Sequence, residues 1–458
     1  MNQQLLKTII TTENLDQLAS LVKDYLSLGW VVYKDISDCS IELSFPKVGE
    51  ANLQFYPSGL MKTYCKVKRD GAKHGIFISF YESGHRHKEK CFNNGLQHGN
   101  FSVWNESGSL IQKGEYKNGQ EDGLWIDYFF NGKKRYEGLW KSGDKNGLFQ
   151  WWYANDILKQ KGKFNLGNKT GKWASWYNTG EKKEVIQYKD GILQGELRKW
   201  GQNRRLHLTG SFKKGGKDGI WKKYYPTGEI REEEIFVLGL KSDLRKVWYL
   251  NGKMKQKEFY EKNIIHGKQI GWFSSGHKKS DGSFVHGQPN GTWEAWYDSG
   301  KRRSSITYDR GTRHGKIQSW YPDSGKKEEG FYSYGKKEGT WKRWSRTGQM
   351  ESEFEYQNGL RHGLCKQWYS NGEKTFQIHY EKGKYHGQWL EWYETGNKMK
   401  SNNYIHGIQN GSCIHWHKNG KKKIDCFYKN GEMNGKFTEW DSSGEIIQEY
   451  RYNRGVVT

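Results

Sequence analysis

Glycine recurs every 24 residues along most of this chain. The series runs from Gly75 to Gly435 without an insertion, and Asp243 is its one departure. We call these positions the column glycines. A second glycine precedes the column glycine by four residues in nearly every period. A fixed period of this length is typical of repeat proteins, in which each unit packs against its neighbours. The period therefore predicts an array of about sixteen similar units.

Each period also carries two aromatic positions and a turn dipeptide. One aromatic residue lies five residues after the column glycine, as at Trp152 and Trp296, and another lies seven residues before it, as at Tyr116. Pairs such as Asn131-Gly132 follow the first aromatic position. Asn and Gly tolerate the positive φ angles of hairpin turns. Each period is thus predicted to form two short antiparallel strands and two turns.

The strand register can be tested from the sequence. If the turn at Gly119 pairs residue 114 with residue 125, then six glycines each face a large ring across a hairpin. These pairs are Gly114 with Trp125, Gly138 with Phe149, Gly162 with Trp173, Gly210 with Trp221, Gly282 with Trp293 and Gly330 with Trp341. Where the glycine is absent its partner changes too, as in Glu234 with Arg245. A ring over a cross-strand glycine pins register, so the pattern favours an antiparallel meander.

The repeat unit resembles a known family. Residues Tyr136 to Gly147 read as an aromatic, an acidic residue, a glycine, an aromatic and then spaced glycines, which is similar to a MORN repeat. The longer unit from Tyr356 to Gly372 resembles the bacterial variant typified by the YwqK-family antitoxins. The resemblance covers roughly residues 70–458. It implies stacked β-hairpins in one long twisted sheet, and an antitoxin or scaffold role. The predicted fold is therefore an all-β, elongated MORN-type hairpin array with a small α/β N-terminal cap.

Residues 1–70 depart from the period and are predicted to be that cap, with residues 71–458 as the array. Apolar residues at helical spacing follow Thr12 and stop before Gly29, which predicts one amphipathic helix. Short strands are expected at 31–33, 41–45 and 53–56, followed by a degenerate repeat turn at 56–59. A cap would cover the terminal strand edge, and a separate recruiting domain is the alternative.

The repeats carry the positive charge of the chain. Residues 1–50 hold four lysines and seven acidic residues, a net charge of −3. The formal net charge of the whole chain is +24, so the remaining residues carry +27. Part of this charge forms what we call the basic column, twelve residues after the column glycine. The basic column consists of Arg135, Lys159, Lys183, Arg231, Lys255, Lys279, Arg303, Lys327 and Lys423.

The basic column has two interpretations. A ladder of cations spaced by about 10 Å would suit the phosphate groups of lipids or nucleic acids. Alternatively, the hairpin register lays each basic stem beside the aromatic residue that follows the column glycine. This interpretation predicts Lys183 beside Trp176, Lys255 beside Trp248, Lys279 beside Trp272 and Arg303 beside Trp296. Basic stems over indole rings shield them and form cation–π contacts, so we favour the structural interpretation.

Histidines and cysteines do not form a recognisable metal motif. Histidine precedes the column glycine six times, as at His98 and His386, and Asp or Asn replaces it elsewhere, which indicates a polar turn position. Cys413, His415 and His417 would share one strand face but lack an evident fourth ligand. The group of His85, His87 and Cys91 also lacks the usual ligand spacing. No metal site is therefore predicted, and the cysteines are expected to be reduced core residues.

The sequence also lacks signals for catalysis and for membrane insertion. It contains no nucleophile elbow, phosphate loop or HExxH motif, so no catalytic residue, cofactor or enzymatic activity is predicted. No apolar run of about 20 residues and no signal peptide is present, which predicts a cytoplasmic protein without a transmembrane segment. The repeats from 204 to 263 are the least regular, through drift or as a specialised contact region.

Surface chemistry then decides the predicted function. Exposed Trp, Tyr and Arg are typical of binding hot spots. The first hypothesis is a non-enzymatic protein-binding scaffold, resembling an antitoxin that binds and neutralises a protein toxin. The alternative is a binder of anionic surfaces, either phospholipid headgroups or nucleic acid, through the basic repeat face.

Overall fold

The computed structural model describes residues 6–11, 31–37, 40–45 and 51–458. Those ranges contain β-strands joined by turns and no helix. The amphipathic helix expected between Thr12 and Gly29 lies outside the described residues. The predicted all-β hairpin array is confirmed.

The N-terminal strands form a small sheet of their own. Strands β1 (Leu6–Thr11), β3 (Ser40–Phe45) and β2 (Val31–Ser37) pair antiparallel in that order. The expected strands at 31–33 and 41–45 are confirmed as parts of β2 and β3. Strand β4 (Ala51–Phe55) instead pairs with β5 (Met61–Val67). The turn between them closes with the N–H of Gly59 donating to the Tyr56 carbonyl oxygen at 2.9 Å, as the repeat turns do, so the degenerate repeat turn is confirmed. The division of the chain at residue 70 stays a prediction.

The chain divides into two compact units. The first comprises residues 1–228 with 237–239, and the second comprises residues 229–236 with 240–458. After β5, the strands of the first unit are β6 (Lys73–Phe80), β7 (Arg86–Asn93), β8 (Leu96–Trp104), β9 (Leu110–Lys117), β10 (Gln120–Tyr128), β11 (Lys134–Lys141), β12 (Asp144–Trp152), β13 (Leu158–Asn165), β14 (Asn168–Trp176), β15 (Lys182–Lys189), β16 (Ile192–Trp200), β17 (Leu206–Lys213) and β18 (Gly216–Tyr224).

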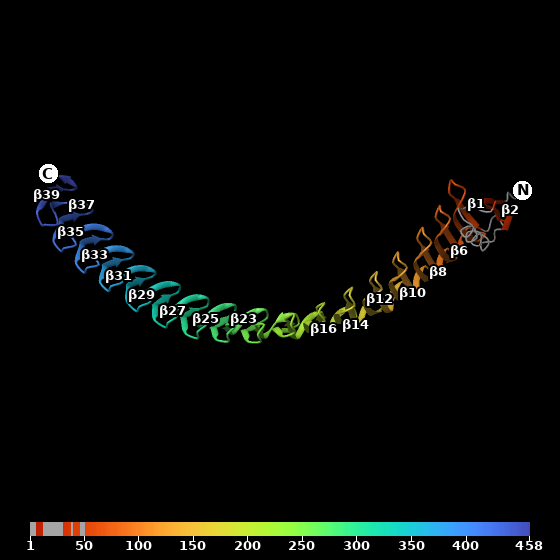
Figure 1. Cartoon of the computed structure of the whole chain (residues 1–458), viewed down its shortest axis with the longest axis horizontal. Coiled ribbons are helices and arrows are strands. Elements are labelled where there is room, and N and C mark those ends of the chain that lie inside the picture. The colour runs from red at the N-terminus through yellow and green to blue at the C-terminus, as the bar shows by residue number, and fades with distance from the viewer. Residues whose placement is uncertain (1–5, 12–30, 38–39, 46–50) are drawn as a thin grey trace. The chain divides into compact units, whose positions relative to one another are not determined.

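The second unit continues the same hairpin pattern. Its strands are β19 (Ile230–Val237), β20 (Leu240–Lys241), β21 (Asp243–Trp248), β22 (Met254–Glu261), β23 (Ile264–Trp272), β24 (Lys278–Val285), β25 (Gln288–Trp296), β26 (Arg302–Asp309), β27 (Thr312–Trp320), β28 (Lys326–Ser333), β29 (Lys336–Trp344), β30 (Met350–Gln357), β31 (Leu360–Trp368), β32 (Lys374–Glu381), β33 (Lys384–Trp392), β34 (Lys398–Ile405), β35 (Ile408–Trp416), β36 (Lys422–Lys429), β37 (Glu432–Met433), β38 (Gly435–Trp440), β39 (Ile446–Asn453) and β40 (Val456–Val457). Within each unit the hairpins follow one another in chain order, as β6 to β16 and β23 to β39 show in Figure 1.

Positive φ explains the column glycines. Gly147 has φ 95° and Gly315 has φ 106°, a region that side chains disfavour. Where the sequence departs from glycine the backbone keeps this conformation, because Asp243 has φ 65°, Asn263 has φ 70° and Arg204 has φ 65°. The strand is interrupted at the first of these, between β20 and β21. The irregular repeats from 204 to 263 therefore keep the common backbone.

The predicted pairing of glycines with rings is confirmed at all six positions. A Cβ atom added to any of these glycines would lie 2.1 to 2.4 Å from an atom of the opposite ring. At one pair, Trp173 is 2% exposed over Gly162, and its indole N–H donates to the Lys163 carbonyl oxygen at 3.2 Å. Neighbouring rings pack edge to face, as Phe164 does against Trp173 with centroids 4.9 Å apart. The core is therefore a row of rings along one face of the sheet, which we call the ring face.

Side chains also join each repeat to the next through backbone groups. The Tyr153 hydroxyl donates to the Trp176 carbonyl oxygen at 3.0 Å, and the Tyr249 hydroxyl donates to that of Trp272 at 2.9 Å. The side-chain amide of Asn251 donates to the Ser274 carbonyl oxygen at 2.9 Å. These bonds satisfy backbone acceptors one repeat further along the chain.

The polar residue before the column glycine works in the same direction. His98 Nδ1 accepts the backbone N–H of Asn118 at 3.4 Å, and a carboxylate oxygen of Asp122 accepts that of Ser142 at 3.1 Å. Histidine and aspartate interchange here because both offer an acceptor at that point. The predicted polar turn position is confirmed, and its role is to complete the following turn.

Candidate binding surface

All nine residues of the basic column are exposed. Five of their lysines lie over a ring, with the Nζ atom 5.5 Å from the ring centroid. These contacts are Lys159 over Tyr153, Lys183 over Tyr177, Lys255 over Tyr249, Lys279 over Phe273 and Lys327 over Tyr321. Ring shielding by the basic column is therefore confirmed for these five lysines.

The rings that we predicted for this shielding are wrong. Lys183 covers Tyr177 and not Trp176, because a β-bulge at Trp176 shifts the register by one residue and pairs that tryptophan with Lys182. The same shift pairs Trp248 with Met254, Trp272 with Lys278 and Trp296 with Arg302. The same bulge recurs elsewhere, as at Trp104, Trp200 and Trp344, so the error comes from one repeated feature.

A second lysine position was missed, eleven residues after the column glycine. We call it the lysine row. Its members lie 5.1 to 5.9 Å from the centroid of the tryptophan in the next repeat. They are Lys134 over Trp152, Lys182 over Trp200, Lys278 over Trp296, Lys326 over Trp344, Lys374 over Trp392, Lys398 over Trp416 and Lys422 over Trp440.

Acidic residues hold part of the lysine row. Lys278 Nζ lies 2.9 Å from a carboxylate oxygen of Asp281, and Lys422 Nζ lies 2.6 Å from one of Asp425. The acidic residue follows the lysine by three positions, and this Lys-x-x-Asp/Glu spacing is the signal that sequence reasoning overlooked. Many lysines of the repeats thus lie over aromatic rings or form ion pairs with carboxylates close to them in the sequence.

A small pocket opens in the first unit beside Arg135. It has a volume of about 260 Å³ and is lined by Ile111, Gln112, Asp127, Tyr128, Phe129, Phe130 and Arg135. The Phe130 ring is 87% exposed, whereas Asp127 is 5% exposed. A guanidinium nitrogen of Arg135 lies 2.5 Å from Asp127 Oδ2, while Asp127 Oδ1 is buried without a hydrogen-bond partner in the described part of the chain. Sequence reasoning missed this pocket because Phe130 occupies a variable turn position.

A cluster of exposed leucines lies on strands β10, β11 and β12. Leu124 pairs directly with Leu139 across β10 and β11, and Leu139 approaches Gly147 so closely that an added Cβ would lie 3.2 Å away. Leu148 follows that glycine, and all three leucines are exposed. Because neighbouring residues of a strand point to opposite faces, Leu124 lies on the face opposite to Trp125 and the ring face. We call these three residues the leucine patch.

The metal candidates from the sequence do not form a group of three ligands among the described residues, although Cys413 Sγ lies 3.6 Å from His415 Nε2. His417 Nε2 lies 2.9 Å from the Trp440 carbonyl oxygen, where other repeats place a tyrosine hydroxyl. His85 Nδ1 lies 2.9 Å from the Glu106 carbonyl oxygen, and the His87 ring contacts the Tyr81 ring in a tilted arrangement with centroids 4.5 Å apart. Each of these histidines is thus held by a structural contact.

The Cys413 thiol belongs to a buried cluster with Cys426 and Phe437. Hydrogen bonding to Cys426 lowers the pKa of Cys413 to about 5; burial opposes this shift and a hydrogen bond with His415 adds to it. The same hydrogen bond to Cys413 and burial raise the pKa of Cys426. Both cysteines are buried and free, as are Cys65 and Cys365, so the expected core role is confirmed for these four.

Comparison with family models matches nine segments of the chain to the MORN repeat variant. The segments are residues 73–94, 97–118, 145–165, 217–237, 244–262, 289–310, 337–358, 361–382 and 409–430. Together these segments cover less than half of the chain, and each is similar to the MORN repeat variant. Two matched segments, 217–237 and 244–262, lie within the least regular stretch, so the similarity to the MORN repeat variant extends into it. The matched segments follow the hairpin units of the array, so the family comparison agrees with the fold.

Other comparisons add little to this assignment. No curated protein sequence matches the chain. A chain of the Photorhabdus luminescens Tc holotoxin pore is similar at 10% identity and a TM-score of 0.15, and a chain of the TcdB2-TccC3-Cdc42 complex at 9% and 0.11. Each match covers 88% of this chain but only 26% and 31%, respectively, of the matched chain. No helix in the described residues is long and apolar enough to cross a membrane.

Proposed function

We propose that this chain is a non-enzymatic, cytoplasmic scaffold that binds a protein partner through its MORN repeats. The observation that carries the proposal is the exposed Phe130 ring beside its pocket, in the same repeats as the leucine patch. An aromatic ring that is 87% exposed gains considerable apolar contact when a partner covers it. The leucine patch adds apolar area where other repeats carry polar residues such as Lys172 and Ser412.

The engagement of the lysines supports a protein partner over an anionic one. Lysines that lie over rings or beside carboxylates, such as Lys278 with Trp296 and Asp281, have part of their field compensated within the protein. The exposure of the whole basic column supports the alternative, a binder of phospholipid headgroups or nucleic acid. In its finer form our proposal makes the partner a protein toxin. That form rests on the resemblance of the repeat unit to the YwqK-family antitoxins.

The proposal is tested by capture with matched variants. Immobilised parent chain is compared with Phe130→Ser and with Leu139→Lys/Leu148→Lys, since serine and lysine occupy the corresponding positions at Ser274, Lys163 and Lys172. Loss of a hot-spot side chain costs about 2 kcal/mol or more, so the variants should bind the captured protein about 30-fold more weakly. The matched control is Leu360→Lys, which replaces an exposed leucine of the second unit.

The alternative predicts a different pattern. Reversal of Lys255, Lys279, Arg303 and Lys327 to Glu would abolish binding to acidic vesicles or to nucleic acid, and that binding would weaken steeply with salt. We expect the parent chain to bind neither at physiological salt. Retention of anionic ligands by the parent, with their loss on charge reversal, would replace our proposal with the alternative.

A further inference from the structure

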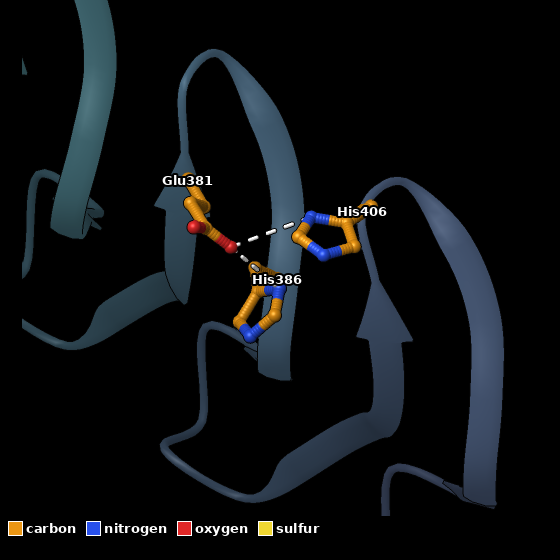
Figure 2. Close-up of side chains that lie close together, drawn as sticks. All are labelled: Glu381, His386 and His406. Atoms are coloured by element: carbon orange, nitrogen blue, oxygen red, sulfur yellow. Dashed lines mark ion pairs between the residues drawn. The ribbon is translucent and has the colours of Figure 1, made fainter.

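Three potential metal ligands converge in the second unit, as Figure 2 shows. Glu381 ends strand β32, His386 lies on β33, and His406 lies in the turn that follows β34. Glu381 Oε2 lies 3.2 Å from His386 Nδ1 and 3.4 Å from His406 Nδ1. One donor atom from each residue lies within 4.8 Å of the others. The group therefore joins side chains from consecutive repeats.

The distances fit a tetrahedral metal ion. Zinc binds histidine nitrogen and carboxylate oxygen at about 2.0 to 2.2 Å, so two ligand atoms on a tetrahedron lie about 3.3 to 3.5 Å apart. The two measured distances, 3.2 and 3.4 Å, are close to that edge length. A pair of histidine–carboxylate ion pairs would give similar distances. The distances alone therefore do not distinguish a metal site from ion pairing.

The state of His386 favours a metal ligand. Its Nδ1 atom is buried and has no hydrogen-bond partner among the described residues, although the carboxylate is only 3.2 Å away. One repeat earlier, the matching atom of His362 accepts the backbone N–H of Lys382 at 3.4 Å. In that repeat the structural role of the histidine is fulfilled, whereas His386 presents an unused nitrogen toward the group.

The same three residue types recur together elsewhere in the chain. Glu261, His266 and His286 occupy the corresponding register positions 120 residues earlier. Glutamate fills the first of these positions only at 261 and 381, and histidine fills the last only at 286 and 406. Both therefore appear only in repeats that contain the other. The His266 and His286 rings lie with centroids 5.3 Å apart, comparable to 5.0 Å for His386 and His406. The two groups differ in that His266 Nδ1 accepts the backbone N–H of His286 at 3.4 Å, so the likeness is one of residue types and ring spacing. A turn position that simply needs a polar residue does not explain this joint occurrence.

We propose that Glu381, His386 and His406 bind a divalent cation of the zinc class. Two imidazoles and one carboxylate suit Zn²⁺ in preference to Mg²⁺ or Ca²⁺, which favour oxygen ligands. Three protein ligands leave a fourth position for water. The bound ion would fasten His406 to the repeat that precedes it. This site departs from the sequence-based expectation that no metal is bound, because His406 lies outside the histidine positions considered there.

The experiment measures zinc binding by the full, tag-free chain. Metal-free protein is titrated with Zn²⁺ against a chromophoric chelator, and Co²⁺ serves as a probe whose visible ligand-field bands report tetrahedral coordination. Asparagine already occupies the position of His406 at Asn358 and Asn430, both with positive φ, so His406→Asn is compatible with the turn. We expect this variant to lose one equivalent of tight zinc, or to bind it about 100-fold more weakly, because a lost ligand costs at least as much as a lost outer-shell partner.

Two further variants make the result decisive. Glu381→Gln introduces the residue that occupies the same register position at Gln357, and it should also weaken zinc binding. The proposal therefore remains testable if one variant folds poorly. The matched control is His362→Asn. His362 occupies the register position of His386, but Gln357 and Lys382 stand where that group has its glutamate and second histidine. This variant should leave zinc binding unchanged. A second equivalent that His286→Asn removes would support the same chemistry at Glu261. Equal zinc affinity in the parent, His406→Asn and Glu381→Gln would overturn the proposal.

Discussion

The repeats around Trp173 and those around Arg245 use the same backbone to bury opposite chemistry. In the first unit, Trp173 covers Gly162, and Lys169 Nζ lies 4.4 Å from the indole centroid. In the second unit, Arg245 occupies the position of that tryptophan, and Glu234 and Glu258 occupy the glycine positions on both neighbouring strands. The first core consists of an aromatic ring packed over a glycine on the neighbouring strand. The other consists of a cation between carboxylates.

The charged core is closely connected. Arg245 nitrogens lie 2.6 Å from Glu232, 2.6 Å from Glu258 and 3.6 Å from Glu234. Glu258 is 3% exposed and also accepts hydrogen bonds from Tyr260 at 2.8 Å and from Gln269 at 2.9 Å. The repeat therefore requires complementarity across its strands and not one particular residue type. The turns and the hydrogen bonds between repeats maintain the frame in both regions.

The largest expected effect follows from removal of the buried cation. Arg245→Leu leaves Glu232, Glu234 and Glu258 close together without their shared partner, which should cost about 3–5 kcal/mol of local stability. Hydrogen exchange of β19 to β23 measures the loss, because repeat arrays open locally. The triple variant Arg245→Trp/Glu234→Gly/Glu258→Gly installs the ring core and should recover most of it. If Arg245→Leu exchanges like the parent, the buried cation does not stabilise these strands.

The ring core should resist added volume. Gly162→Ala places a Cβ atom 2.1 Å from the Trp173 ring, so the ring must move, at a cost of about 1–3 kcal/mol. Urea unfolding monitored in β13 and β14 measures this cost. The control Gly171→Ala tests backbone strain alone, because Gly171 has φ 66° and no atom within 4 Å of an added Cβ. Because Gly162 lacks a positive φ, unchanged stability in Gly162→Ala would show that the ring accommodates the added volume.

The charged core should be sensitive to pH in both directions. Burial opposes ionisation of Glu258, but hydrogen bonds from Gln269, Tyr260 and Arg245 prevail and lower its pKa. A lowered folded-state pKa gives stability that is present above the unfolded pKa and lost as pH falls through the folded value. Burial and the Glu258 carboxylate raise the pKa of Tyr260 to about 12, so its contribution is lost as pH rises above the unfolded value of 10 toward 12. Hydrogen exchange of β21 to β23 at several pH values tests both limits, with β13 to β15 as the reference. Parallel pH profiles in the two regions would contradict this prediction.

The smallest expected effect concerns the lysine row. Lys278→Ala removes an ammonium group 5.1 Å from the Trp296 centroid, which should cost about 0.5–1 kcal/mol. Exposed Lys172→Ala is the control and should change stability by less than about 0.5 kcal/mol. Thermal unfolding of both variants, at low and high salt, compares them. A larger loss in the control would mean that the row does not shield the rings.

Sequence reasoning found the features that repeat and missed those that depend on small shifts. The 24-residue period and the pairing of Gly162 with Trp173 followed from spacing, because hairpin geometry relates spacing to contact. The ring beside Lys183 was predicted wrongly, since a β-bulge leaves no trace in a strict period. The Glu381 group was missed for a related reason. Its members occupy three different register positions, and only the turn between repeats brings them together.

The links between repeats also have a direction, and this gives the chain a polarity of assembly. The Tyr153 hydroxyl and the His98 ring each serve a backbone group in the repeat that follows, so an upstream repeat supplies what a downstream repeat needs. As synthesis proceeds, each new hairpin meets a neighbour that is already complete. A cut that removes downstream repeats leaves hydroxyl and imidazole groups that water satisfies readily. A cut that removes upstream repeats leaves backbone groups such as the Trp176 carbonyl without their partner. The first repeat that remains is therefore destabilised.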